Sequence, residues 1–238
     1  MKKVLLIGDS IRLGYDKYVK ESMKNFAEVY FTDDNDKFTA NILRHFHVIT
    51  DMLELYDCDV VHWNAGAWDN IRIYGDGPLT RPDVYADNVL RITKRIKYVF
   101  PEAKIIFATS TPVIESGYID DFEYRRNEDV ELYNKLAVDV VKSEGCIVND
   151  LYGLLRDQPE SLHSDQSHYY TPEATELIGM QVNRVICDAL GVGYDKLTPL
   201  DKDSLVLRRA KSDHEMYEKR GHIYVYKRDP KERLDNGI

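Results

Sequence analysis

Short apolar runs alternate with amphipathic segments along most of this sequence, and this alternation limits the possible folds more than any other feature. The runs are three to five residues long, as in buried strands, and they lie at 3–7, 28–31, 60–63, 104–108 and 146–148. The segments between them have the 3.6-residue period of helices, and they lie at about 13–25, 39–55, 83–99, 128–143 and from 172 to about 190.

Repeated strand–helix units of this length predict a parallel sheet with helices on both faces. The fold class expected here is therefore α/β, a three-layer α/β/α sandwich around a central parallel sheet of five strands. Such sheets bind ligands beyond the carboxyl ends of their strands. Residues that carry chemistry are expected in the loops that directly follow strands.

Composition excludes several classes of protein. Hydrophobic residues make up 43% of the 238 residues and charged residues 31%, as in soluble globular proteins. The net charge of −9 disfavours binding to nucleic acid or anionic membranes. The three cysteines, Cys58, Cys146 and Cys187, form no CxxC pair, which argues against a disulfide framework or a zinc site. No apolar run is long enough for a membrane span or a signal peptide, so a cytoplasmic location is expected.

A short polar turn, Gly8, Asp9 and Ser10, directly follows the first predicted strand. A serine hydroxyl at this edge of the sheet can act as a nucleophile only when a base removes its proton. Taken alone, the turn is more typical of a helix cap formed by Asp and Ser. The hypothesis of a nucleophile at Ser10 therefore needs a base from elsewhere in the chain.

Asp165 and His168 supply such a base in a polar loop before the helix start at Thr171 and Pro172. The Asp-x-x-His spacing lets one loop present both side chains to the same point. The carboxylate can orient one imidazole nitrogen while the other faces a serine, which is the arrangement of a Ser-His-Asp triad. Ser10 is thus the candidate nucleophile, His168 the general base and Asp165 its orienting residue.

A third polar segment, residues 62–70, follows the predicted strand at 60–63. Acyl transfer passes through an oxyanion that needs preorganised N–H donors. Candidates for these donors are the backbone of Ser10, the side chain of Asn64 and the backbone around Gly66. The candidate substrate contacts are Asp9, Trp68 and Asp69.

These three segments together resemble the SGNH/GDSL hydrolase superfamily over residues 3 to about 190. The resemblance implies a flavodoxin-like three-layer fold, the triad roles given above, and ester hydrolysis without a metal or cofactor. Two departures stand out. Trp68 occupies the place of the family's oxyanion asparagine, and the loop at 33–38 lacks the family's second-block glycine. The pattern Asn64-x-Gly66 is instead similar to that of sugar O-acetyl esterases and transferases.

The resemblance implies a serine ester hydrolase that removes a short acyl group, foremost acetyl, from a carbohydrate or another small polar substrate. Two alternatives stay open: an O-acyltransferase with the same triad, and a non-catalytic binding module on a degenerate hydrolase scaffold. The hydrolase domain is expected at 1–194. A charged extension follows at 195–238, and its alternating stretch at 222–227 could form a strand that supports a homodimer.

Overall fold

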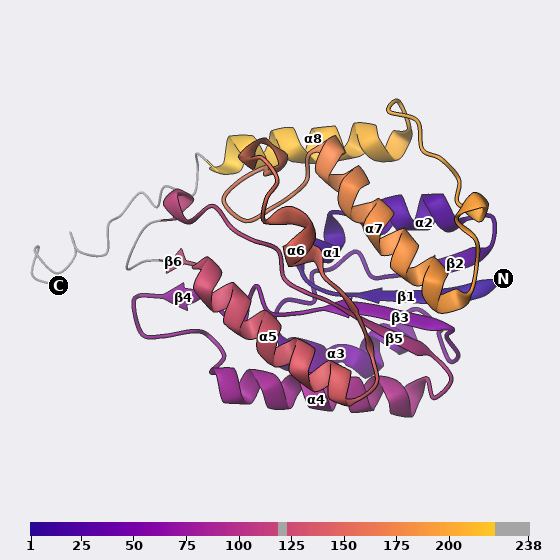
Figure 1. Cartoon of the computed structure of the whole chain (residues 1–238), viewed down its shortest axis with the longest axis horizontal. Helices are drawn as coiled ribbons and strands as arrows, with labels where there is room; N and C mark the ends of the chain where they lie inside the picture. Colours follow the sequence, from indigo (N-terminus) through magenta and orange to yellow (C-terminus); the bar gives the residue numbers. More distant parts are fainter. Residues whose placement is uncertain (119–122, 222–238) are drawn as a thin grey trace, which may run out of the picture.

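The computed structural model describes residues 1–118 and 123–221, and its centre is a parallel sheet of five strands (Figure 1). The strands run in the order β2-β1-β3-β5-β7, and all neighbouring pairs are parallel. Their bounds are β1 (Lys2–Ile7), β2 (Ala27–Tyr30), β3 (Val60–Asn64), β5 (Lys104–Ala108) and β7 (Ile147–Asn149). This sheet confirms the predicted five-stranded architecture, with the strand order of the flavodoxin-like folds.

Helices cover both faces of the sheet, which explains why the strands are apolar on both sides. One face carries α3 (Thr39–Met52), α4 (Pro82–Val99) and α5 (Asn127–Ser143), and the other carries α2 (Asp16–Met23), α6 (Leu151–Leu155) and α7 (Pro172–Leu190) (Figure 1). Strand β1 shows the alternation. Its Leu5 and Ile7 pack in the core beneath α3–α5, whereas Val4 and Leu6 pack in the core beneath α2 and α7.

The ends of α7 follow from the sequence in detail. The Thr171 hydroxyl accepts a hydrogen bond from the Ala174 N–H, and Pro172 occupies the first helical position. Gly191 ends the helix in the left-handed conformation, at φ 66°. The cap at Thr171 fixes where the loop that carries Asp165 and His168 ends.

The helix predicted at about 13–25 is present as one shorter helix, and a separate short helix precedes it. These are α1 (Ser10–Leu13) and α2, and they are separated at Gly14 and Tyr15. A Cβ on Gly14 would stand 2.9 Å from the ring of Tyr170. The break therefore lets the chain turn closely against Tyr170.

Two segments that lie between the predicted strands and helices, residues 70–82 and 113–127, meet in a small antiparallel ribbon. It pairs β4 (Arg72–Ile73) with β6 (Glu123–Tyr124). The guanidinium of Arg72 binds the carboxylate of Asp129 on α5 through two hydrogen bonds, of 2.7 and 2.8 Å. The ribbon is thereby tied to the helical layer at the carboxyl edge of the sheet. Short 3₁₀ turns occur at η1 (Glu115–Gly117), η2 (Glu160–Leu162) and η3 (Tyr194–Lys196).

The charged extension begins with a long helix, α8 (Leu205–Gly221), which lies along α7 and α2 (Figure 1). Leu207 and Ala210 are buried in this contact, and the Thr198 N–H donates to the Ser22 carbonyl oxygen before the helix begins. The strand expected at 222–227 lies outside the described residues. Within the described part of the chain, no helix has the length and apolar character to span a bilayer.

Candidate active site

Ser10 lies at the carboxyl end of β1, where the predicted sheet placed it. It is the first residue of α1 and is partly exposed. Asp9 precedes it as the N-cap, and its carboxylate accepts a hydrogen bond of 2.9 Å from the Ile11 N–H. The N–H groups of a first helical turn have no partner within the helix. The Ser10 N–H is therefore placed to serve a ligand next to its own hydroxyl.

A buried ion network holds this turn against the loop after β2. The Gly8 N–H donates to Asp36 at 2.9 Å, and the Asp36 N–H donates back to the Gly8 carbonyl oxygen at 3.1 Å. The fully buried Arg12 pairs with Asp16 at 2.6 Å and lies 3.8 Å from the Asp36 carboxylate. The sequence analysis missed Arg12 and Asp36. The i,i+4 spacing of Arg12 and Asp16 was the available signal.

Asp165 and His168 form the pair that their spacing predicts. The Oδ1 atom of Asp165 accepts from the N–H groups of Ser167 and His168, at 2.7 and 2.8 Å. The Oδ2 atom lies 2.7 Å from Nδ1 of the His168 ring. Burial raises the pKa of Asp165, but the hydrogen bond and charge of His168 outweigh it and lower the pKa below its usual value. The ionised carboxylate accepts a hydrogen bond from the Nδ1–H group of His168. This tautomer has its proton on Nδ1, so Nε2 is the nitrogen that can act as the base.

Tyr170 joins this loop to the Ser10 turn. Its ring lies against the ring of His168, with the centroids 5.0 Å apart. Its hydroxyl donates a hydrogen bond of 2.7 Å to the carbonyl oxygen of Ser10, across 160 residues of sequence. The structure thus brings the predicted nucleophile and the predicted base around one tyrosine. The sequence analysis missed Tyr170, since a tyrosine before a helix is no signal by itself.

Asn64 and Gly66 lie at the end of β3, next to the Ser10 turn. Asn64 is fully buried, and its Nδ2 donates one hydrogen bond of 2.8 Å to Asp9 Oδ1. Gly66 has φ 139°, and a Cβ there would stand 2.8 Å from the Ser110 hydroxyl oxygen. Only glycine fits this close approach without strain. The amide of Asn64 is therefore held rigidly beside Ser10 and has a second N–H left to donate.

Two of the three residues predicted as substrate contacts bind other residues of the chain in this structure. Asp9 is fully buried and is used by Ile11 and Asn64. Asp69 is also fully buried, and it accepts hydrogen bonds from the Thr39 N–H at 3.1 Å and the Thr39 hydroxyl at 2.6 Å. Both carboxylates hold loops together. Trp68 is partly exposed, so it stays a candidate substrate contact.

Arg125, directly after β6, links the loop of Asn64 to the loop of His168. Its Nε donates to the Ala67 carbonyl oxygen at 2.6 Å, and its Nη1 lies 3.4 Å from the hydroxyl of Ser167. Sequence reasoning missed this residue because the 113–127 segment has no periodic pattern. Only the folded chain brings Arg125 between the two loops.

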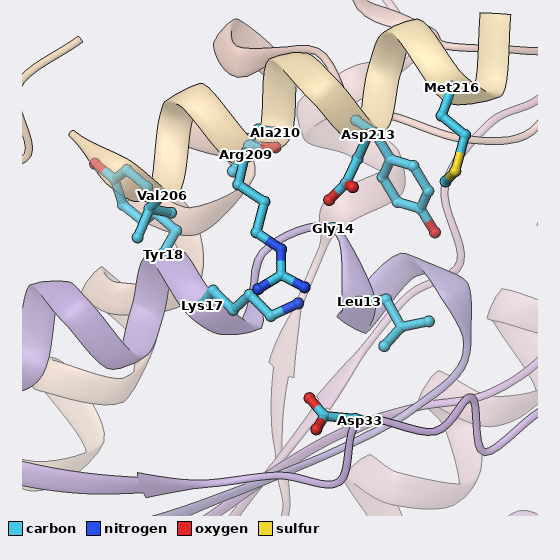
Figure 2. Close-up of a pocket in the computed structure, with 12 residues that line it drawn as sticks. Leu13, Gly14, Lys17, Tyr18, Asp33, Val206, Arg209, Ala210, Asp213 and Met216 are labelled. Atoms are coloured by element: carbon cyan, nitrogen blue, oxygen red, sulfur yellow. The ribbon is translucent and has the colours of Figure 1, made fainter. Parts of the chain in front are cut away.

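A cavity of about 230 Å³ lies behind Tyr170, between α8 and the turn from α1 to α2 (Figure 2). Figure 2 shows the Arg209 side chain extending from α8 toward Lys17, with Asp33 and Asp213 nearby. Neither Ser10 nor His168 lines this cavity. Within residues 1–118 and 123–221, no cluster of three or more His, Cys, Asp or Glu side chains could hold a metal ion.

No protein-family model matches the sequence, and no curated protein matches it significantly. Solved structures do match. A lipase/acylhydrolase from Enterococcus faecalis is 21% identical, with a TM-score of 0.63 over 84% of this chain and 100% of that chain. Axe2, an acetylxylan esterase from Geobacillus stearothermophilus, is 14% identical, with a TM-score of 0.59 over 81% of this chain and 95% of that chain.

A GDSL-like lipase from Bacteroides thetaiotaomicron is 15% identical, with a TM-score of 0.55 over 79% of this chain and 89% of that chain. The three alignments cover 79–84% of this chain. The shared architecture agrees with the strand order and the layers described above. This chain has the α/β fold of the SGNH/GDSL hydrolases.

Proposed function

We propose that this protein is a serine ester hydrolase that removes a short acyl group, foremost acetyl, from a carbohydrate or another small polar substrate. The observation that carries the proposal is the arrangement of Asp165, His168 and Ser10 around Tyr170. Asp165 holds the imidazole through a 2.7 Å contact, and Tyr170 contacts both the imidazole and the backbone of Ser10. Fold alone does not determine activity, so the proposal depends on this site.

In the proposed reaction, His168 removes the proton of the Ser10 hydroxyl while its oxygen attacks the acyl carbonyl carbon. The Ser10 N–H and the second N–H of Asn64 bind the oxyanion that forms. His168 then gives its proton to the leaving alcohol, and an acyl-enzyme remains on Ser10. Water, activated by the same imidazole, releases the acid and restores the serine.

The preference for a short acyl group and a polar alcohol is supported by two likenesses. The Asn64-x-Gly66 pattern is similar to that of sugar O-acetyl esterases, and the protein from Geobacillus stearothermophilus is an acetylxylan esterase.

The test is hydrolysis of p-nitrophenyl acetate, butyrate and octanoate in the presence of a chelator, by the wild type and by Ser10→Ala and His168→Ala. We expect turnover to be fastest on acetate and to fall by about 10³-fold or more in both variants. The matched control is Ser143→Ala, an exposed serine at the end of α5, which should keep wild-type rates.

Equal rates in the wild type and Ser10→Ala would contradict the serine mechanism. Turnover of no ester would contradict the hydrolase assignment and would favour the acyltransferase or the binding module instead.

A further inference from the structure

Arg125 is a buried cation whose partners are all neutral. The residue is only 9% exposed. It donates to the Ala67 carbonyl oxygen at 2.6 Å, the Tyr118 hydroxyl at 3.3 Å and the Ser167 hydroxyl at 3.4 Å. Among the described residues, no carboxylate oxygen lies within 4.0 Å of the Arg125 guanidinium, the limit for an ion pair. Its Nη2 has no hydrogen-bond partner among them.

Two other arginines with buried or partly buried side chains pair with carboxylates. Arg12 is fully buried and binds Asp16 at 2.6 Å. Arg72 is partly buried and binds Asp129 through two nitrogens. A buried charge is costly unless an opposite charge compensates it. Arg125 is therefore a buried arginine that has no carboxylate at ion-pair distance among the described residues, and a bound anion would compensate its charge.

The position of Arg125 indicates where that anion would come from. Ala67 lies in the loop with Asn64, Gly66 and Trp68, and Ser167 directly precedes His168. The positive charge of Arg125 also acts on the carboxylate of Asp9, next to Ser10. The guanidinium thus lies where the three loops that carry the proposed machinery meet, within the reach of an ester bound at Ser10.

We infer that Arg125 binds a carboxylate of the ester substrate, so that the preferred substrates are acidic, such as an acetylated uronic acid. This inference rests on the proposed function and names the substrate class of the same site. A guanidinium edge with Nη1 and Nη2 matches the two oxygens of a carboxylate. A single arginine among neutral partners suits one negative charge better than the two charges of a phosphate.

A purely structural role for Arg125 is the alternative, since its hydrogen bonds connect two loops. The two roles differ in what a substitution does. Loosened loops would slow all esters alike, whereas loss of a carboxylate contact slows only acidic esters. The experiment therefore compares matched neutral and acidic substrates.

The first pair of substrates is p-nitrophenyl butyrate and mono-p-nitrophenyl succinate, which differ by a methyl against a carboxylate on the acyl group. The second pair is monoacetylated glucose and monoacetylated glucuronic acid, which differ by a carboxylate on the alcohol. The proteins are the wild type, Arg125→Gln, Arg125→Lys and the control Arg126→Gln, which changes the exposed neighbour. Circular dichroism establishes that each variant is folded.

We expect the wild type to have a kcat/KM about tenfold or more higher for the acidic member of one pair, since a charge-assisted hydrogen bond is worth that much. Arg125→Gln should remove this preference, Arg125→Lys should keep part of it, and Arg126→Gln should retain it. The pair that shows the preference tells whether the carboxylate belongs to the acyl group or to the alcohol.

No preference in either pair, or equal losses on both members in Arg125→Gln, would overturn the inference while Ser10-dependent hydrolysis of p-nitrophenyl acetate still upholds the proposed function. If no ester is turned over, calorimetric titration of glucuronate and glucose into Ser10→Ala, with and without Arg125→Gln, decides the matter. Glucuronate binding that requires Arg125 would uphold the anion site alone. The absence of such binding would reject it.

Discussion

At the scale of single residues, the site depends on a glycine that leaves room for its neighbours. A Cβ on Gly8 would stand 1.9 Å from Oδ1 of Asn64 and 3.0 Å from Cβ of Arg12. The Gly8 backbone is fixed on its other side by two hydrogen bonds with Asp36. Because the backbone cannot retreat, the Asn64 side chain would have to move.

Gly8→Ala is therefore expected to lower kcat for p-nitrophenyl acetate by about 10²-fold, the cost of losing one oxyanion donor. The control is Gly75→Ala, an open position with φ 72° where only the backbone is strained. It should keep its activity and lose about 1–2 kcal/mol of stability. Wild-type kcat in Gly8→Ala would show that the position of Asn64 does not matter to turnover.

Asp9 makes the stability of the protein depend on pH. Its carboxylate is fully buried, and Oδ2 has no partner among the described residues. Burial raises its pKa from the ordinary 3.8 to about 6, against the hydrogen bonds from Ile11 and Asn64 and the charge of Arg125. Between these two values the folded state binds more protons than the unfolded state. Stability due to Asp9 therefore falls as the pH rises through that window.

Asp9→Asn should remove this dependence. The free energy of unfolding of the wild type, minus that of the variant, is expected to fall by about 2 kcal/mol between pH 4 and pH 7, since each unit of pKa shift corresponds to about 1.4 kcal/mol and part of the effect lies below pH 4. Urea denaturation of both proteins at pH 4, 5, 6 and 7 measures it. A difference that is constant with pH would show that Asp9 is ionised alike in the folded and unfolded states.

At the scale of elements, α8 supports the catalytic loop from outside the sheet. Nδ1 of His214 on this helix lies 2.9 Å from the hydroxyl of Ser164. The same hydroxyl accepts from the Tyr170 N–H at 3.1 Å, and the Ser164 N–H donates to the His168 carbonyl oxygen at 2.6 Å. The helix thus acts on the loop that presents His168 without contacting the predicted nucleophile.

His214→Ala should lower kcat for p-nitrophenyl acetate by about threefold to tenfold, because one hydrogen bond to the loop is worth about 1 kcal/mol. The KM should change less, since the residue touches no substrate. His47→Ala, on the exposed side of α3, serves as the control and should have no effect. An unchanged kcat in His214→Ala would show that the loop holds His168 without α8.

At the scale of the whole molecule, stability comes from two cores on the two faces of one sheet. Phe107 of β5 is fully buried beneath α4 and α5, and its ring meets that of Trp63 edge to face at 4.9 Å. Both residues lie in strands at the centre of the sheet. Loss of the Phe107 ring would open a cavity that the surrounding elements cannot close.

Phe107→Ala is expected to lower the free energy of unfolding, measured in urea, by about 3–5 kcal/mol. The m value, the slope of this free energy against urea concentration, should not change. Tyr98→Ala is the control. That ring is 87% exposed on α4, and its removal should change the free energy by less than about 0.5 kcal/mol. A loss below about 1 kcal/mol in Phe107→Ala would mean that the core collapses around the missing ring.

The sequence by itself predicted the features that depend on nearby residues. The five strands, the cap at Thr171 and the pairing of Asp165 with His168 each follow from periodicity or spacing within a few residues. Their residue types act through short-range hydrogen bonds and through burial on one or both faces, which a local pattern records. The break at Gly14 escaped prediction because its cause is a ring contributed by Tyr170, far along the chain.

Only the tertiary structure decided which loops meet and which side chains remain accessible. Asp9 and Asp69 follow strands, as ligand contacts do, yet both are buried and bind partners from other elements. Tyr170 and Arg125 carry no local pattern and gain their places from contacts across the fold. Burial and electrostatic compensation are properties of the whole packed chain, and for that reason no local pattern contains them.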